Sequence, residues 1–104
     1  MPRDRNKEAL LLDYYGSLLT EHQQNVLEEY YNEDLSMNEI ADNLQISKSA
    51  VGDLIKRCQA QLEEYEDKLG LISRNIQIKA LLKEIKQEAN GNIEDIISEI
   101  EKLI

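Results

Sequence analysis

A short segment in the middle of the chain carries the side chains best suited to contact a nucleic acid. The candidate residues are Ser47, Lys48, Ser49, Gly52, Asp53, Lys56 and Arg57. Lysine and arginine contact phosphate oxygens and guanine, and serine is a short donor that reads bases permissively. In the second helix of a helix-turn-helix, this spacing lies along the exposed N-terminal face that meets the major groove, with Arg57 one step further round.

Two of these residues weaken direct base reading. Gly52 offers no side chain to a base, and Asp53 faces phosphates unfavourably unless it pairs with Lys48 or Lys56. We therefore expect any DNA affinity to be modest and sensitive to salt. The competing interpretation is an ordinary solvated helix face. The fit of the surrounding apolar positions to the motif favours DNA contact.

No other residues form a catalytic or metal-binding pattern. His22 has no Cys or Asp at metal-ligand spacing, and Cys58 falls on an apolar seam, where a free cysteine packs as a small hydrophobe. The tyrosines are expected to be half-buried packing residues whose hydroxyls reach water. There is no glycine-rich phosphate loop, metal cluster or carboxylate pair with a pocket. The sequence therefore predicts a protein that is not an enzyme and that uses no metal or cofactor.

The helix-turn-helix is predicted over residues 36–58. Ser36 caps its first helix, with Glu39 completing a capping box, and Ser47 caps its second. Gln45 stands in the turn where glycine is usual, and a left-handed conformation there costs roughly 1 kcal/mol. Ile46 is expected to fill the angle between the helices. The other expected buried positions are Ile40, Ala41, Leu44, Ala50, Val51, Leu54 and Ile55.

Two helices are expected before this motif. The first spans about 6–19, with an apolar stripe at helical spacing. Its stripe is Leu11, Leu12, Tyr15, Leu18 and Leu19. The second begins after Thr20, with Gln23 completing a capping box, and runs to about Tyr31. It is expected to bury Val26, Leu27 and Tyr30.

Three helical stretches are expected to complete the chain. The second helix of the motif continues along an apolar heptad seam until Gly70 ends it. The seam is Val51, Ile55, Cys58, Leu62, Tyr65, Leu69 and Ile72. A helix over about 76–89 and a last helix capped by Asn92 are expected to form a hairpin. The inward positions are Ile78, Leu81, Leu82 and Ile85 on one helix, and Ile93, Ile96, Ile97, Ile100, Leu103 and Ile104 on the other.

Length and composition agree with an all-α fold. The chain has 104 residues, 41% of them apolar and 32% charged, with four glycines and one proline. Its expected organisation is a helical domain over 1–72 and a C-terminal hairpin over 73–104. No run is long enough to cross a membrane, and the single cysteine fits a reducing compartment, so a cytoplasmic location is expected. The net charge of −9 is awkward for a nucleic-acid binder, but residues 36–58 are neutral.

The stretch LTEHQQNVLEEYYNEDLSMNEIADNLQISKSAVGDLIKR resembles region 4 of bacterial sigma factors, which reads promoter DNA. More closely, residues 9–72 are similar to the YlxM family, on LLDYYGSLLT, EEYYNEDLSMNEIA and KRCQAQLEEYEDKL. The resemblance implies a small helical protein with a sigma-like helix-turn-helix and a link to the signal recognition particle pathway. It carries over no catalytic residues. Lys48, Lys56 and Arg57 match family positions, whereas Gly52 stands where a larger residue is expected.

These features favour a DNA-binding regulatory protein that uses the face from Ser47 to Arg57. The alternative is a protein-interaction adaptor for signal recognition particle components, whose acidic segments 21–35 and 63–67 would suit a basic partner. Direct RNA binding is a third hypothesis, disfavoured by the net charge and by the lack of exposed aromatic platforms. A homodimer is expected, formed through the heptad seam or the C-terminal hairpin.

Overall fold

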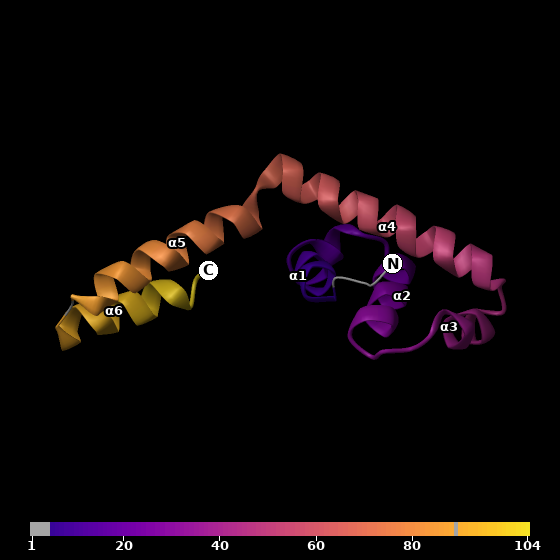
Figure 1. Cartoon of the computed structure of the whole chain (residues 1–104), viewed down its shortest axis with the longest axis horizontal. Helices are drawn as coiled ribbons and strands as arrows, with labels where there is room; N and C mark the ends of the chain where they lie inside the picture. The colour runs from indigo at the N-terminus through magenta and orange to yellow at the C-terminus, as the bar shows by residue number, and fades with distance from the viewer. Residues whose placement is uncertain (1–4, 89) are drawn as a thin grey trace. The chain divides into compact units, whose positions relative to one another are not determined.

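The computed structural model describes the backbone of residues 5–88 and 90–104, and all its regular elements are helical (Figure 1). In chain order they are α1 (Arg5–Tyr15), the 3-10 turn η1 (Gly16–Leu18), α2 (Glu21–Tyr31), α3 (Met37–Leu44), α4 (Lys48–Leu69), α5 (Leu71–Gln87) and α6 (Gly91–Glu101). The predicted all-α class with a helix-turn-helix is therefore confirmed. None of the described helices is long and apolar enough to span a bilayer.

The chain divides into two compact units, Met1–Leu69 and Gly70–Ile104. In the first, α1, α2 and α3 all pack on one side of the long α4 (Figure 1). Four residues of the heptad seam supply the α4 side of this core and are at most 2% exposed: Val51, Ile55, Cys58 and Leu62. The seam is therefore covered by the chain's own helices over these turns, so it is not free to form the expected dimer interface there.

Local capping fixes where the helices of the first unit begin. Gln23 N donates to Thr20 Oγ1 (3.2 Å), and Thr20 N donates to Gln23 Oε1 (3.1 Å). The same reciprocal pair joins Ser36 and Glu39, with both distances 3.1 Å. Both capping boxes were expected from the sequence and both are confirmed. They satisfy amide groups that a helix N-terminus otherwise leaves without a partner.

The first helix ends earlier than predicted. The α-helix stops at Tyr15, a 3-10 turn covers Gly16–Leu18, and the backbone is extended at Leu19. Gly16 is buried, and a Cβ atom there would lie 3.0 Å from Leu12 Cδ1, so the tightened turn uses the absence of a side chain. The change of helix type rotates Leu18 outward. Its side chain is 52% exposed, and its predicted burial is wrong.

Fewer side chains of the helix-turn-helix are buried than predicted. Ile40, Ala41, Val51 and Ile55 are buried as expected, whereas Leu44 and Leu54 are half-buried. Ala50 is exposed, and Ile46 does not fill the angle between the helices, because 40% of it remains exposed. The eight-residue α3 is too short to cover the turn and the first residues of α4.

The second unit is a hairpin of α5 and α6 that differs from the predicted one at two boundaries. Gly70 ends α4 as expected, and its backbone is left-handed (φ 63°). However, α5 follows at once, because Arg74 N already donates to Gly70 O (2.9 Å). The last helix is capped by Asn90, whose Oδ1 accepts from Ile93 N (3.2 Å), and not by Asn92. The predicted end of α5 at Ala89 lies outside the described residues, and the domain division at residue 72 stays a prediction.

Candidate nucleic-acid interface

The first three turns of α4 present one side to the core and the other to solvent. The buried side is Val51, Ile55 and Cys58. Of the predicted site residues, Gly52 is half-buried and the other six, Ser47, Lys48, Ser49, Asp53, Lys56 and Arg57, are exposed. The helix packs on α3 along its buried side, which is the arrangement that leaves the outer side of a second helix free.

The turn between α3 and α4 fixes the direction in which this outer side points. Gln45 is left-handed (φ 58°, ψ 42°), Gln45 N donates to Asp42 O (3.3 Å), and Ile46 N donates to Ala41 O (3.1 Å). These two bonds form a Schellman motif that closes the end of α3. Ser47 then caps α4, with its Oγ accepting from Ala50 N at 3.0 Å. The Ser47 hydroxyl keeps its proton available for an external acceptor.

A shallow hollow of about 370 Å³ gathers most of the predicted residues. It is lined by Met37, Lys48, Ser49, Gly52, Asp53 and Lys56. A Cβ atom on Gly52 would be 3.8 Å from Met37 Sδ, so the glycine leaves the hollow open without being required by crowding. Met37 is not among the residues that the sequence predicts for this surface. It is the first residue of α3, and its closeness to Gly52 follows from the crossing of α3 and α4.

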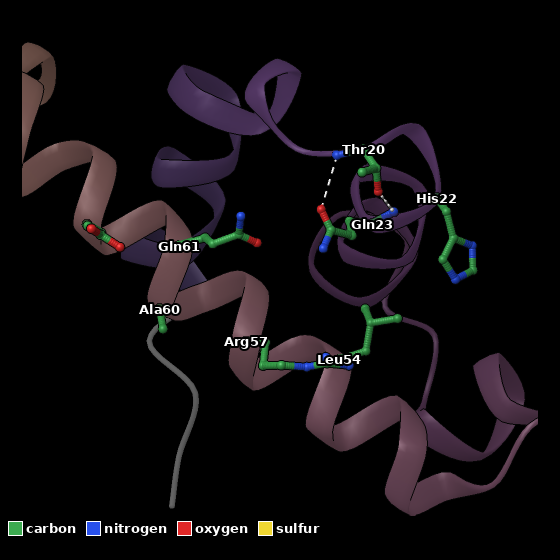
Figure 2. Close-up of a pocket in the computed structure, with 8 residues that line it drawn as sticks. Thr20, His22, Gln23, Leu54, Arg57, Ala60 and Gln61 are labelled. Atoms are coloured by element: carbon green, nitrogen blue, oxygen red, sulfur yellow. Dashed lines mark hydrogen bonds between the residues drawn. The ribbon is translucent and has the colours of Figure 1, made fainter.

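Arg57 lies apart from this hollow. It lines a second open groove of about 550 Å³ between the start of α2 and the middle of α4 (Figure 2). The groove residues are Thr20, His22, Gln23, Leu54, Arg57, Ala60, Gln61 and Glu64. Figure 2 shows the Arg57 side chain extended along α4 toward Leu54. The structure therefore brings five predicted residues to one hollow and puts Arg57 at the neighbouring groove.

The lysines and arginine of the first unit whose side chains the structure describes (residues 6–69) fall into two groups. Lys7 and Lys68 pair with carboxylates in the second half of α4, at 3.7 Å from Glu63 and 2.8 Å from Glu64. The hydrogen bond from Lys68 lowers the pKa of Glu64 and raises that of Lys68. By contrast, Lys48, Lys56 and Arg57 form no ion pair with any described residue. Asp53 also has no ion-pair partner in the described part of the chain, so its expected pairing with Lys48 or Lys56 is absent.

Cys58 and three of the five tyrosines belong to the core, whereas Tyr14 and Tyr65 are half-buried, as predicted. Cys58 is fully buried, and this burial raises the pKa of its thiol, although the nearby Arg57 charge opposes the shift. Tyr30 is buried as expected, and Tyr15 and Tyr31 are buried more deeply than the predicted half-burial. Their hydroxyls do not simply reach water: Tyr15 Oη donates to Glu66 Oε1 (2.5 Å), and Gln59 Nε2 donates to Tyr31 Oη. His22 is exposed, and the described residues contain no group of three potential metal ligands.

The fold and this surface define an all-α protein with a helix-turn-helix whose second helix is extended. Residues 3–103 match the family described as "Putative helix-turn-helix protein, YlxM / p13 like", UPF0122. A UPF0122 protein of Desulforamulus reducens is 49% identical over 86% of this chain and 76% of its own length. One of Clostridium kluyveri is 46% identical over 91% and 79%, and one of Clostridium botulinum is 41% identical over 96% and 95%. The chain belongs to the UPF0122 family, which confirms the resemblance to YlxM proteins.

Proposed function

We propose that this protein binds duplex DNA through the outer side of α4 and acts as a DNA-binding regulator. One observation carries the proposal. Among the first-unit residues whose side chains the structure describes (6–69), the lysines and arginine without a carboxylate partner are Lys48, Lys56 and Arg57, and all three are exposed on the first half of α4. Cations on that side of a second helix can exchange their counterions for DNA phosphates.

The remaining residues of this surface favour tolerant reading of sequence. Ser47 and Ser49 offer short hydroxyls that accept several base edges, and Gly52 offers no side chain. The unpaired Asp53 carboxylate repels phosphates and favours an approach centred on Lys48 and Lys56. Most contacts of this surface would therefore be with the DNA phosphate backbone, and few would distinguish one base sequence from another.

The number of cations limits the salt dependence. Three phosphate contacts give a slope of about −3 in a plot of log K against log salt. Between about 25 and 200 mM salt, affinity for a mixed duplex pool should then fall by about three to five hundredfold. The measurement is fluorescence anisotropy with a labelled duplex pool.

Charge reversal at the hollow provides the decisive comparison. The variant Lys48→Glu/Lys56→Glu should lose binding while keeping its helical circular dichroism. The matched control Lys79→Glu/Lys83→Glu changes the net charge equally at two exposed lysines of α5, and it should bind like the unmodified protein. If both double variants lose DNA binding equally, the loss comes from the change in net charge and not from a specific binding surface on α4. Absence of binding at the lowest salt would overturn the proposal.

The acidic second half of α4 favours a second candidate function. The side chains of Glu63 and Glu64 are 50% and 61% exposed, and Asp67 is also exposed. Such a surface suits a basic protein partner, and the YlxM resemblance suggests components of the signal recognition particle pathway. On this alternative the protein is an adaptor that does not bind DNA. Copurification with the particle's GTPase or its receptor, abolished by Glu63→Lys/Asp67→Lys, would support it.

A further inference from the structure

The hairpin of α5 and α6 buries little of its own apolar surface. Leu82 and Ile97 are buried, whereas six other large aliphatic side chains on the two helices and the C-terminal turn are between 38% and 85% exposed. These six, called here the hairpin face, are Leu81, Ile85, Ile93, Ile96, Ile100 and Leu103. Soluble chains expose single aliphatic residues routinely, but a continuous group of this size marks a surface that binds something.

Helical spacing places these residues on one side of the hairpin. On α5, Leu81 and Ile85 lie on one side of the buried Leu82, and Lys86 lies on the other. On α6, Ile96 and Ile100 lie on one side of the buried Ile97, and Glu101 lies on the other. Lys86 Nζ and Glu101 Oε1 are 3.8 Å apart, so this ion pair marks one side of the hairpin. The exposed aliphatic side chains of both helices therefore share the opposite side.

We propose that the hairpin face is covered by the same face of a second copy of this chain. The six side chains expose on the order of 600 Å², which together with a polar rim reaches the ~800 Å² per partner of a standard interface. The centre of the face is purely aliphatic, as in homodimer interfaces, which are more apolar than those of transient complexes. A twofold contact needs only a surface that complements itself.

The charges around the face predict how such a dimer responds to salt. Glu84 and Asp95 are exposed beside the aliphatic residues, and each chain carries a net charge of −9. Two copies therefore repel each other electrostatically while their aliphatic surfaces attract. Added salt screens the repulsion and leaves the burial of apolar surface intact, so it strengthens the dimer. DNA binding through α4 has the opposite salt dependence, and the dimer proposal does not rest on it.

The test is sedimentation equilibrium of the full chain from about 1 to 100 µM, at about 50 and 500 mM NaCl. A protomer has a mass of 12.0 kDa, so the dimer doubles this value, and its dissociation constant should be lower at the higher salt. A monomeric mass at the highest protein and salt concentrations would overturn the proposal. A dimer that dissociates as salt increases would also overturn it, because that interface would be held by charge.

Paired variants locate the interface. Leu81→Lys/Ile96→Lys puts two charges at the centre of the face and should weaken the dimer by at least a hundredfold. The control Ile76→Lys/Leu18→Lys places the same charges at exposed aliphatic positions outside it and should leave the dissociation constant unchanged. The milder Leu81→Ala/Ile96→Ala should weaken the dimer about tenfold. It tests the same interface if the lysine double variant fails to fold. If the hairpin-face variant and the control variant change the dissociation constant equally, the hairpin face is not the dimer interface.

Discussion

Gln45 adopts a conformation that few residues other than glycine adopt readily. Its φ of 58° and ψ of 42° lie in the left-handed region, where the Cβ atom crowds the following carbonyl. The conformation is required because the Schellman bonds that end α3 also set the direction in which α4 leaves the turn. The side chain of Gln45 is exposed, and it forms no hydrogen bond or ion pair with a described residue that would offset the strain.

Replacing Gln45 by glycine should stabilise the protein. Glycine removes the left-handed penalty of about 1 kcal/mol but has more freedom in the unfolded chain, so we expect a net gain of about 0.5 kcal/mol. Urea unfolding followed by circular dichroism measures the change. The control Gln45→Ala keeps the Cβ atom and should give no gain. A loss of stability in the glycine variant would indicate that the glutamine side chain contributes an interaction of its own.

The roles of the single residues were predictable where they depend on local sequence. Thr20 with Gln23, and Ser36 with Glu39, form their capping boxes within three residues of each other, so the pattern alone is sufficient. Met37 and Arg57 show the limit. Met37 borders the hollow because α3 crosses α4, and Arg57 lines a separate groove because α2 packs beside α4. The spacing of residues along α4 cannot predict either position, because both depend on how other helices pack against α4.

Among the helices, α3 depends most on its cap because it has eight residues and holds the turn in place. Replacing Ser36 by alanine removes the acceptor for Glu39 N and should destabilise the first unit by about 1 kcal/mol. The matched control is Ser98→Ala in α6, an exposed serine inside a helix, where alanine is at least as favourable. Thermal unfolding of both variants provides the comparison. Equal stability of the Ser36 variant and the unmodified protein would show that packing alone holds α3.

The apolar periodicity predicted which stretches are helices better than which side chains are covered. Val51, Ile55, Cys58 and Leu62 are buried as their heptad spacing indicated, because α1, α2 and α3 all pack on that side of α4. Leu81 and Ile85 repeat at helical spacing too, yet they are exposed, because each helix of the hairpin packs against only one other helix of the hairpin. Periodicity identifies an apolar face, but burial depends on how many elements are available to cover it.

At the scale of the whole chain, the two units differ in how many apolar side chains they bury. Of the apolar side chains buried among the described residues, fourteen belong to Met1–Leu69 and only three, Ile72, Leu82 and Ile97, belong to Gly70–Ile104. A chain of fewer than about 40 residues rarely folds alone without a metal, a disulfide or a partner. The first unit therefore has what an independent fold needs, whereas the hairpin has apolar surface to cover and too little chain to cover it.

This inequality predicts different behaviour for the two halves when they are produced separately. A fragment of residues 1–70 should unfold cooperatively in urea, because the core of α1–α4 is supplied from within it. A fragment of residues 71–104 should be weakly helical at low concentration and gain helix as its concentration rises, because association covers its aliphatic face. Circular dichroism at 222 nm over a hundredfold range of concentration, about 1 to 100 µM, measures this gain. High helicity that does not change with concentration would mean that the hairpin is stable without a partner. In that case its exposed face would need another explanation, even if the full chain still forms dimers.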